Sequence, residues 1–153
     1  MHSLQSLLFI LVNPNLLIIS LCHIARVFNT SPVSPRKCRI LLTKIALLLF
    51  TGEKFPTNEA TSLFFGVSKL FQNKDASLRQ MVYLVIKELA NTAEDVIMVT
   101  SSIMKDTAVG SDVVYRANAI RALCRIIDVC QPYTPEQGHQ ILTLMTGIHR
   151  PGH

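Results

Sequence analysis

The sequence predicts an all-α protein built from stacked pairs of amphipathic helices. Of its 153 residues, 49% are apolar and 16% are charged, a balance that excludes a largely disordered chain. Apolar residues recur at helical spacing in segments that are bounded by Ser, Thr, Asp, Pro and Gly. One such segment repeats after 37 positions, from Asp75 to Asp112. Helix pairs with a period near 40 residues are typical of HEAT or armadillo solenoids, and we expect about three such pairs.

Residues 1–24 form an apolar leader ahead of this pattern and contain no Lys, Arg, Asp or Glu. The run is long enough to cross a hydrocarbon core of about 30 Å, but Asn13-Pro14-Asn15 divides it into two halves that are each too short. A secretory signal would open with basic residues, which are absent here. We expect an apolar helical hairpin or a leader foreign to the fold, and a membrane segment is the alternative.

The first helix is predicted over residues 35–50. Ser34 and Pro35 mark its start, and Gly52 marks its end. A second helix begins at Thr57 or Asn58 and ends before Asn73. The residues expected on the buried stripes are Ile40, Leu41, Ile45, Leu48 and Leu49 in the first helix, and Ala60, Leu63, Phe64, Val67, Leu70 and Phe71 in the second.

Four more helices are predicted in the rest of the chain. The third spans residues 76–90 behind Asp75, and the fourth spans 92–106 because Thr92-Ala93-Glu94-Asp95 resembles a capping box. Gly110 and Ser111 then form a break. A fifth helix covers about 112–129, and Thr134-Pro135-Glu136-Gln137 predicts a sixth to about 146.

The internal repeat aligns Asp75 and Arg79 of the third helix with Asp112 and Arg116 of the fifth. The apolar stripe is kept in the same register, because Val82, Val85, Ile86, Leu89 and Ala90 fall on Ala119, Ala122, Leu123, Ile126 and Ile127. An Asp at a helix start accepts hydrogen bonds from free backbone N–H groups, and an Arg one turn later can reach a carboxylate or carbonyl of the adjacent layer. We interpret these four residues as a structural ladder, with a ligand-binding role as the alternative.

The sequence holds no arrangement of residues that indicates catalysis, a cofactor or a metal. The Cys residues form no Cys-x-x-Cys unit, and the His residues lack paired metal-ligand spacing. Cys38 and Cys124 fall within helical stripes, so we expect buried, reduced thiols of the kind found in a cytosolic protein.

The net charge of +5 is concentrated near the first helix. Arg36, Lys37, Arg39 and Lys44 lie in a stretch without acidic residues, whereas ten basic and ten acidic residues cancel from Ile45 onward. Such a basic patch can attract an anionic membrane, a nucleic acid or an acidic protein. We do not expect nucleic acid as the partner, because no basic stripe with exposed aromatic residues continues over several elements.

Phe65 departs from the polar pattern on the second helix. Its neighbours on the predicted outward face are Thr61, Ser62, Ser68, Lys69 and Gln72. An aromatic side chain among small polar residues is a candidate interface anchor. The alternative is that Phe65 packs against the leader or a neighbouring repeat.

Residues 25–128 resemble the N-terminal trunk of the coatomer gamma subunit family, adaptin-like large subunits of the COPI vesicle coat. The resemblance rests on short strings along this range. They are Ala25-Arg26-Val27-Phe28-Asn29, Pro35-Arg36-Lys37-Cys38, Leu42-Thr43-Lys44-Ile45, Glu59-Ala60-Thr61, Lys69-Leu70-Phe71-Gln72, Ala93-Glu94-Asp95-Val96-Ile97, Val99-Thr100-Ser101-Ser102 and Arg121-Ala122-Leu123-Cys124.

The resemblance implies an α-solenoid without catalytic activity or cofactor, in a cytoplasmic coat that associates peripherally with Golgi membranes and COPI vesicles. It implies the zeta, beta and delta coatomer subunits and an Arf-type GTPase in its GTP state as partners. On this chain the GTPase-facing surface would lie on the outward sides of the second and fourth helices. Its candidate residues are Phe65, Lys69, Ser101 and Lys105.

Both ends depart from the family pattern. We therefore divide the chain into a leader, residues 1–24, a solenoid, residues 25–128, and a divergent C-terminal helix and tail, residues 129–153. A truncated isoform or an imperfect gene model would explain both ends. The alternatives to a coat component are a small membrane-anchored helical protein and a basic helical-repeat protein that binds RNA or anionic lipid.

Overall fold

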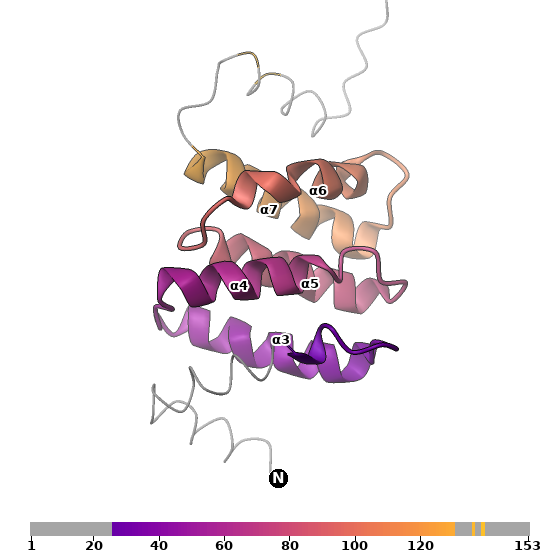
Figure 1. Ribbon diagram of the computed structural model, residues 1–153. Coiled ribbons are helices and arrows are strands. Elements are labelled where there is room, and N and C mark those ends of the chain that lie inside the picture. The colour runs from indigo at the N-terminus through magenta and orange to yellow at the C-terminus, as the bar shows by residue number, and fades with distance from the viewer. Residues whose placement is uncertain (1–25, 131–135, 137–138, 140–153) are drawn as a thin grey trace, which may run out of the picture.

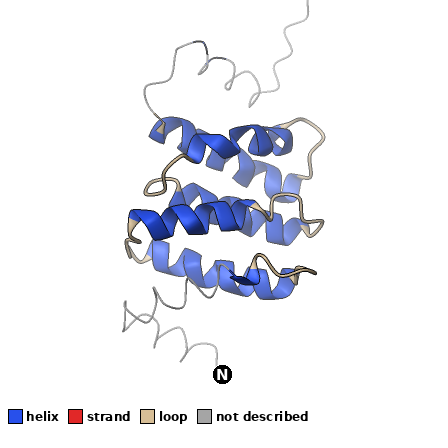
Figure 2. Cartoon of the chain, in the orientation of Figure 1, coloured by secondary structure: helices blue, strands red, loops and turns tan. Residues whose placement is uncertain are grey.

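The computed structural model describes residues 26–130 together with residues 136 and 139. All regular secondary structure in these residues is helical, which confirms the predicted fold class (Figure 2). The elements are α3 (Pro35–Phe50), α4 (Thr57–Ser68), α5 (Ala76–Leu89), the 3₁₀ helix η1 (Val96–Val99), α6 (Thr100–Thr107) and α7 (Val113–Val129). The leader and the sixth predicted helix lie outside the described residues.

The helices stack along one direction in two layers (Figure 1). Helix α5 lies between α3 and α7 and contacts both. Helix α4 packs on α5, and α6 packs on α7, so these two form the second layer. Because each helix contacts its neighbours in the stack, the arrangement is that of an α-solenoid.

The core is a continuous apolar cluster that runs through the stack. Every residue predicted on the buried stripe of α4 is buried, and so is every predicted stripe residue of α5 and α7. Positions related by the 37-residue repeat therefore have the same environment: Val82, Val85 and Ile86 are fully buried in α5, as are Ala119 and Ala122 in α7. This shared burial confirms the internal repeat.

The predicted stripe of α3 is wrong in part. Ile40 is 49% exposed, whereas Cys38, Leu42 and Ala46 are buried. Helix α3 carries apolar residues on nearly every side, so periodicity alone does not select the face that packs on α5. Ile40, Leu47 and Phe50 share an exposed face at the end of the described stack.

Two of the predicted helices, α5 and α7, are capped at their N-termini by Asp side chains. The Asp75 carboxylate accepts a hydrogen bond from the Leu78 amide at 2.7 Å, and the Asp112 carboxylate accepts one from the Val114 amide at 2.9 Å. Each carboxylate therefore satisfies a backbone donor that has no partner within its helix.

Helix α4 is shorter than predicted, because it ends at Ser68 rather than just before Asn73. The chain continues in tight turns, in which the amides of Leu70 and Phe71 bond to carbonyls three residues earlier. These turns carry Leu70 and Phe71 into the core, where both are buried. The apolar periodicity thus continues past the helix end and hides the boundary.

The prediction that residues 92–106 form one capped helix is wrong. Asp95 has a φ of 54°, a left-handed conformation that breaks a helix, and η1 and α6 follow it separately. The Glu94 amide donates to Thr61 Oγ1 of α4 at 2.9 Å instead of entering a capping box. A tertiary contact therefore replaces the local cap that the sequence suggested.

Glycine ends two segments as predicted. Gly52 follows α3 with a φ of +88°, and Gly110 lies in the break before α7 with a φ of +102°. Both values lie in the region that glycine adopts without a steric penalty.

The described residues include no helix that is both long enough and apolar enough to cross a membrane.

Candidate functional site

The four candidate interface residues lie on or beside α4 and α6. Lys69 directly follows α4 and is exposed, and Ser101 and Lys105 are exposed on α6. Phe65 is half-buried, and its ring meets the Phe64 ring edge-on with a centroid separation of 5.3 Å and an interplanar angle of 83°. Only part of the Phe65 side chain is therefore available to a partner.

The structure brings Lys69 and Lys105 to the same surface groove, although 36 positions separate them in the sequence. The groove has a volume of about 190 Å³ and lies between the end of α4 and α6, with α5 behind it. Phe65 and Ser101 are not among its lining residues. Those are Ser68, Lys69, Phe71, Gln72, Arg79, Ser102, Lys105 and Asp106.

The mouth of the groove is positively charged. The Lys69 ammonium donates a hydrogen bond to Asn29 Oδ1 at 2.7 Å, which steadies the side chain without neutralising it. Within residues 26–130, neither Lys69 nor Lys105 forms an ion pair. Two cationic groups therefore face the solvent at this site.

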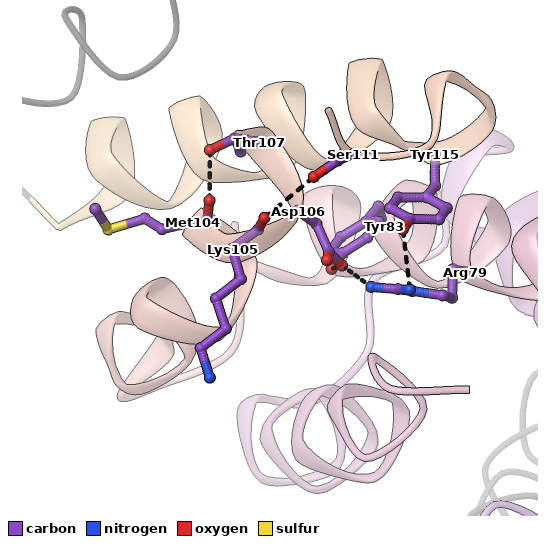
Figure 3. Close-up of polar contacts among 8 residues, drawn as sticks. All are labelled: Arg79, Tyr83, Met104, Lys105, Asp106, Thr107, Ser111 and Tyr115. Atoms are coloured by element: carbon purple, nitrogen blue, oxygen red, sulfur yellow. Dashed lines mark hydrogen bonds and ion pairs between the residues drawn. The ribbon is translucent and has the colours of Figure 1, made fainter. Parts of the chain in front are cut away.

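The back wall of the groove is a network that connects three helices (Figure 3). Asp106 of α6 is buried, forms an ion pair with Arg79 of α5 and accepts a hydrogen bond from the Tyr83 hydroxyl. Arg79 also donates to the Tyr115 hydroxyl of α7 at 3.0 Å, and its guanidinium carbon lies 4.0 Å from the centroid of that ring. The single carboxylate of the groove is thus already matched by a cation.

The protonation states of Tyr83 and Arg79 are set by their own burial and by the charge of Asp106. Burial raises the pKa of Tyr83 far above its usual range, and the hydrogen bond to Asp106 raises it further. Burial alone would lower the pKa of Arg79, but the hydrogen bond and charge of Asp106 outweigh it, so that pKa is raised. At neutral pH, Tyr83 is therefore uncharged and Arg79 is cationic.

The second Arg of the internal repeat also bonds to α6. Arg116 Nε donates to the Thr107 carbonyl at 3.0 Å, next to the residue that Arg79 contacts. The C-terminal turn of α6 is thus bound on two sides. Arg79 of α5 binds its Asp106 carboxylate, and Arg116 of α7 binds its Thr107 carbonyl. The helix has only eight residues, so these contacts fix the wall that carries Lys105.

The sequence identified Arg79 as a residue of the structural ladder and assigned no role to Asp106 or Tyr83. Asp106 occupies an inward position of α6, three residues after the buried Ile103. One signal could have identified Asp106, because it is a carboxylate at an apolar stripe position. A buried charge requires a partner, and the Arg of the internal repeat is a candidate for that partner.

The basic patch is a separate surface on α3. Arg36 and Lys37 are exposed, whereas Arg39 and Lys44 are half-exposed. None of the four forms an ion pair in the part of the chain that the structure describes. The exposed Ile40, Leu47 and Phe50 lie on the same helix, so this surface combines cations with apolar side chains.

The described residues contain no cluster of His, Cys, Asp or Glu that could hold a metal ion. Cys38 is a buried free thiol as expected, but Cys124 is only half-buried. Burial raises the pKa of both thiols, which disfavours the reactive thiolate.

These features define a class of protein, an α-solenoid with a charged surface groove and a core that repeats along the stack of helices. Comparison with known families gives the same class and narrows it. The model for the adaptin N terminal region matches residues 19–130. The chain belongs to this family.

Curated relatives confirm the resemblance seen in residues 25–128. The probable coatomer subunit gamma of Schizosaccharomyces pombe is 65% identical over 104 residues, which is 68% of this chain and 12% of that protein. The human coatomer subunit gamma-2 is 57% identical over 104 residues, which is again 68% of this chain and 12% of that protein. The Saccharomyces cerevisiae coatomer subunit gamma is 51% identical over 110 residues, 72% of this chain and 12% of that protein. The chain thus spans about 12% of the length of these relatives.

The Tyr83–Asp106 hydrogen bond should stabilise the fold at neutral pH and lose this effect at alkaline pH. Because folding raises the pKa of Tyr83, this stability is fully present below the unfolded tyrosine pKa of about 10 and is lost as the pH rises above it. The difference in free energy of unfolding between the wild type and Tyr83→Phe should therefore shrink between pH of about 9 and about 11. Urea denaturation at each pH measures it. A difference that stays constant over this range would contradict the assignment.

Proposed function

We propose that this chain acts as a non-enzymatic component of the COPI vesicle coat in intracellular transport between the endoplasmic reticulum and the Golgi. The supporting observation is its 65% identity over 104 residues to a probable coatomer subunit gamma. The matched stretch covers 68% of this chain. The chain would work in the cytoplasm and associate with Golgi membranes through the coat and its zeta, beta and delta subunits.

The partner proposed for the α4–α6 surface is an Arf-type GTPase in its GTP state. Lys69, Ser101 and Lys105 are all accessible on this side of the stack. Neither lysine forms an ion pair within the described residues, so the surface is positively charged, and Phe65 adds a partly exposed aromatic ring on α4.

Binding to the GTPase should depend on its nucleotide and on the α6 face. In a pull-down, the full chain should retain more GTP-loaded than GDP-loaded Arf-type GTPase. Ser101→Trp places a bulky ring on this face and should reduce capture about tenfold, equivalent to about 1.4 kcal/mol. Ala117→Trp on the exposed side of α7 is the matched control and should bind like the wild type. Equal capture of the two nucleotide forms, or no capture, would refute the proposal.

A second candidate function is binding to anionic membranes through α3. The specific observation is that Ile40, Leu47 and Phe50 are 49%, 42% and 58% exposed on a helix that also carries four basic residues. Apolar side chains next to cations suit the boundary between lipid headgroups and acyl chains better than they suit RNA.

Membrane binding by α3 should require both kinds of residue. In co-sedimentation with phosphatidylserine-containing vesicles, Arg36→Gln with Lys37→Gln should weaken binding about thirtyfold, since each surface cation contributes about 1 kcal/mol. Phe50→Ser should weaken it as well, whereas Lys54→Gln in the following loop should have little effect. Equal binding of all variants, or equal binding to neutral vesicles, would exclude this function.

A further inference from the structure

The groove between α4 and α6 is lined mainly by hydrogen-bond donors. Lys69 and Lys105 supply ammonium groups, and Ser102 and Gln72 supply a hydroxyl and an amide at the exposed rim. Its one carboxylate, that of Asp106, is occupied by Arg79 and Tyr83. The groups that remain available to a ligand therefore favour an anionic oxygen acceptor.

We propose that this groove receives the carboxylate of an Asp or Glu side chain from the bound protein partner, between Lys69 and Lys105. The inference rests on the proposed GTPase-binding function and names the chemistry by which the α4–α6 surface recognises its partner. The two lysines come from different helices, so a carboxylate that contacts both would also fix the orientation of the partner.

The charge balance of the groove supports an anionic ligand. Arg79 and Asp106 compensate each other, which leaves the two lysines as the net positive charge. An Asp or Glu side chain is the anion that an unmodified protein partner carries at neutral pH. The volume of about 190 Å³ accommodates a carboxylate and its methylene stem.

The donor geometry of the groove favours separate contacts to anionic oxygens. An Arg fork would bind a carboxylate or a phosphate through two parallel N–H groups. Arg79 already directs one terminal nitrogen to Tyr115 and the other to Asp106, so it offers no free fork. Lys69 and Lys105 act as separate point charges.

The site is arranged before a ligand binds. The Lys69 side chain is held by Asn29, and the wall that carries Lys105 is fixed by the contacts of Arg79 and Arg116 with α6. Such preorganisation reduces the entropy lost on binding, so two exposed lysines can contribute more than isolated surface charges.

The first test uses the full chain and the GTP-loaded Arf-type GTPase. The double variant Lys69→Gln and Lys105→Gln should bind about tenfold more weakly than the wild type, with a smaller loss of affinity as salt is raised. Lys54→Gln, an exposed lysine beyond α3, is the control and should behave as the wild type. Wild-type binding that the double variant retains in full would overturn the inference but leave the proposed function intact. No wild-type binding would refute the proposed function instead.

The second test needs no protein partner and measures the anisotropy of a fluorescent hexaglutamate peptide. The wild type and Lys54→Gln should bind the peptide, and the double variant should lose most of this binding. Free glutamate should displace the peptide at least as well as inorganic phosphate at equal ionic strength. Equal peptide binding by the double variant, or preferential displacement by phosphate, would overturn a carboxylate site. Circular dichroism should show the same helical content in all variants, since the substituted lysines are exposed.

Discussion

The contact between Arg79 and Asp106 is the interaction on which the described architecture most depends. It connects α5, the central helix of one layer, to the short α6 of the other. Both side chains are largely removed from solvent, so loss of either would leave a charge without a partner at a cost of about 3–5 kcal/mol. The Tyr83 hydroxyl donates to Asp106, and Arg79 donates to the Tyr115 hydroxyl, so the network reaches α7.

The same contact links stability to surface chemistry. By matching the only carboxylate in the groove, Arg79 leaves Lys69 and Lys105 as its net charge. By holding Asp106, it also sets the position of Lys105, the preceding residue on α6. A single structural pair therefore shapes the surface at which we place partner binding.

The sequence predicted most strongly those parts of the fold in which local and tertiary signals agree. Helices α5 and α7 begin at Asp caps, carry regular stripes and repeat each other, so their bounds and buried faces followed from spacing. The start of α6 could not be predicted from spacing. Asp95 adopts a left-handed conformation, and the Glu94 amide bonds to Thr61 of α4 instead of forming the local cap. The buried face of α3 could not be predicted either, because apolar residues surround that helix.

The candidate site shows a similar limit. Lys69 and Lys105 were candidates from helix geometry and the family resemblance, and Arg79 was identified from the internal repeat. The groove nevertheless exists only because α4, α5 and α6 meet in space. Asp106 and Tyr83 were missed, since a carboxylate and a phenol on inward helix positions resemble ordinary variation in a stripe. Their role becomes visible only when α6 packs against α5, which places Asp106 against Arg79 and Tyr83.

Hydrogen exchange of the α6 amides tests the central role of the Arg79–Asp106 contact most directly. In Asp106→Asn, the weakened contact should allow α6 to open locally, so its amides should exchange about tenfold faster or more than in the wild type. Amides of α3, at the other end of the described stack, should change far less. Equal acceleration in α3 and α6, or unchanged exchange in α6, would contradict the account.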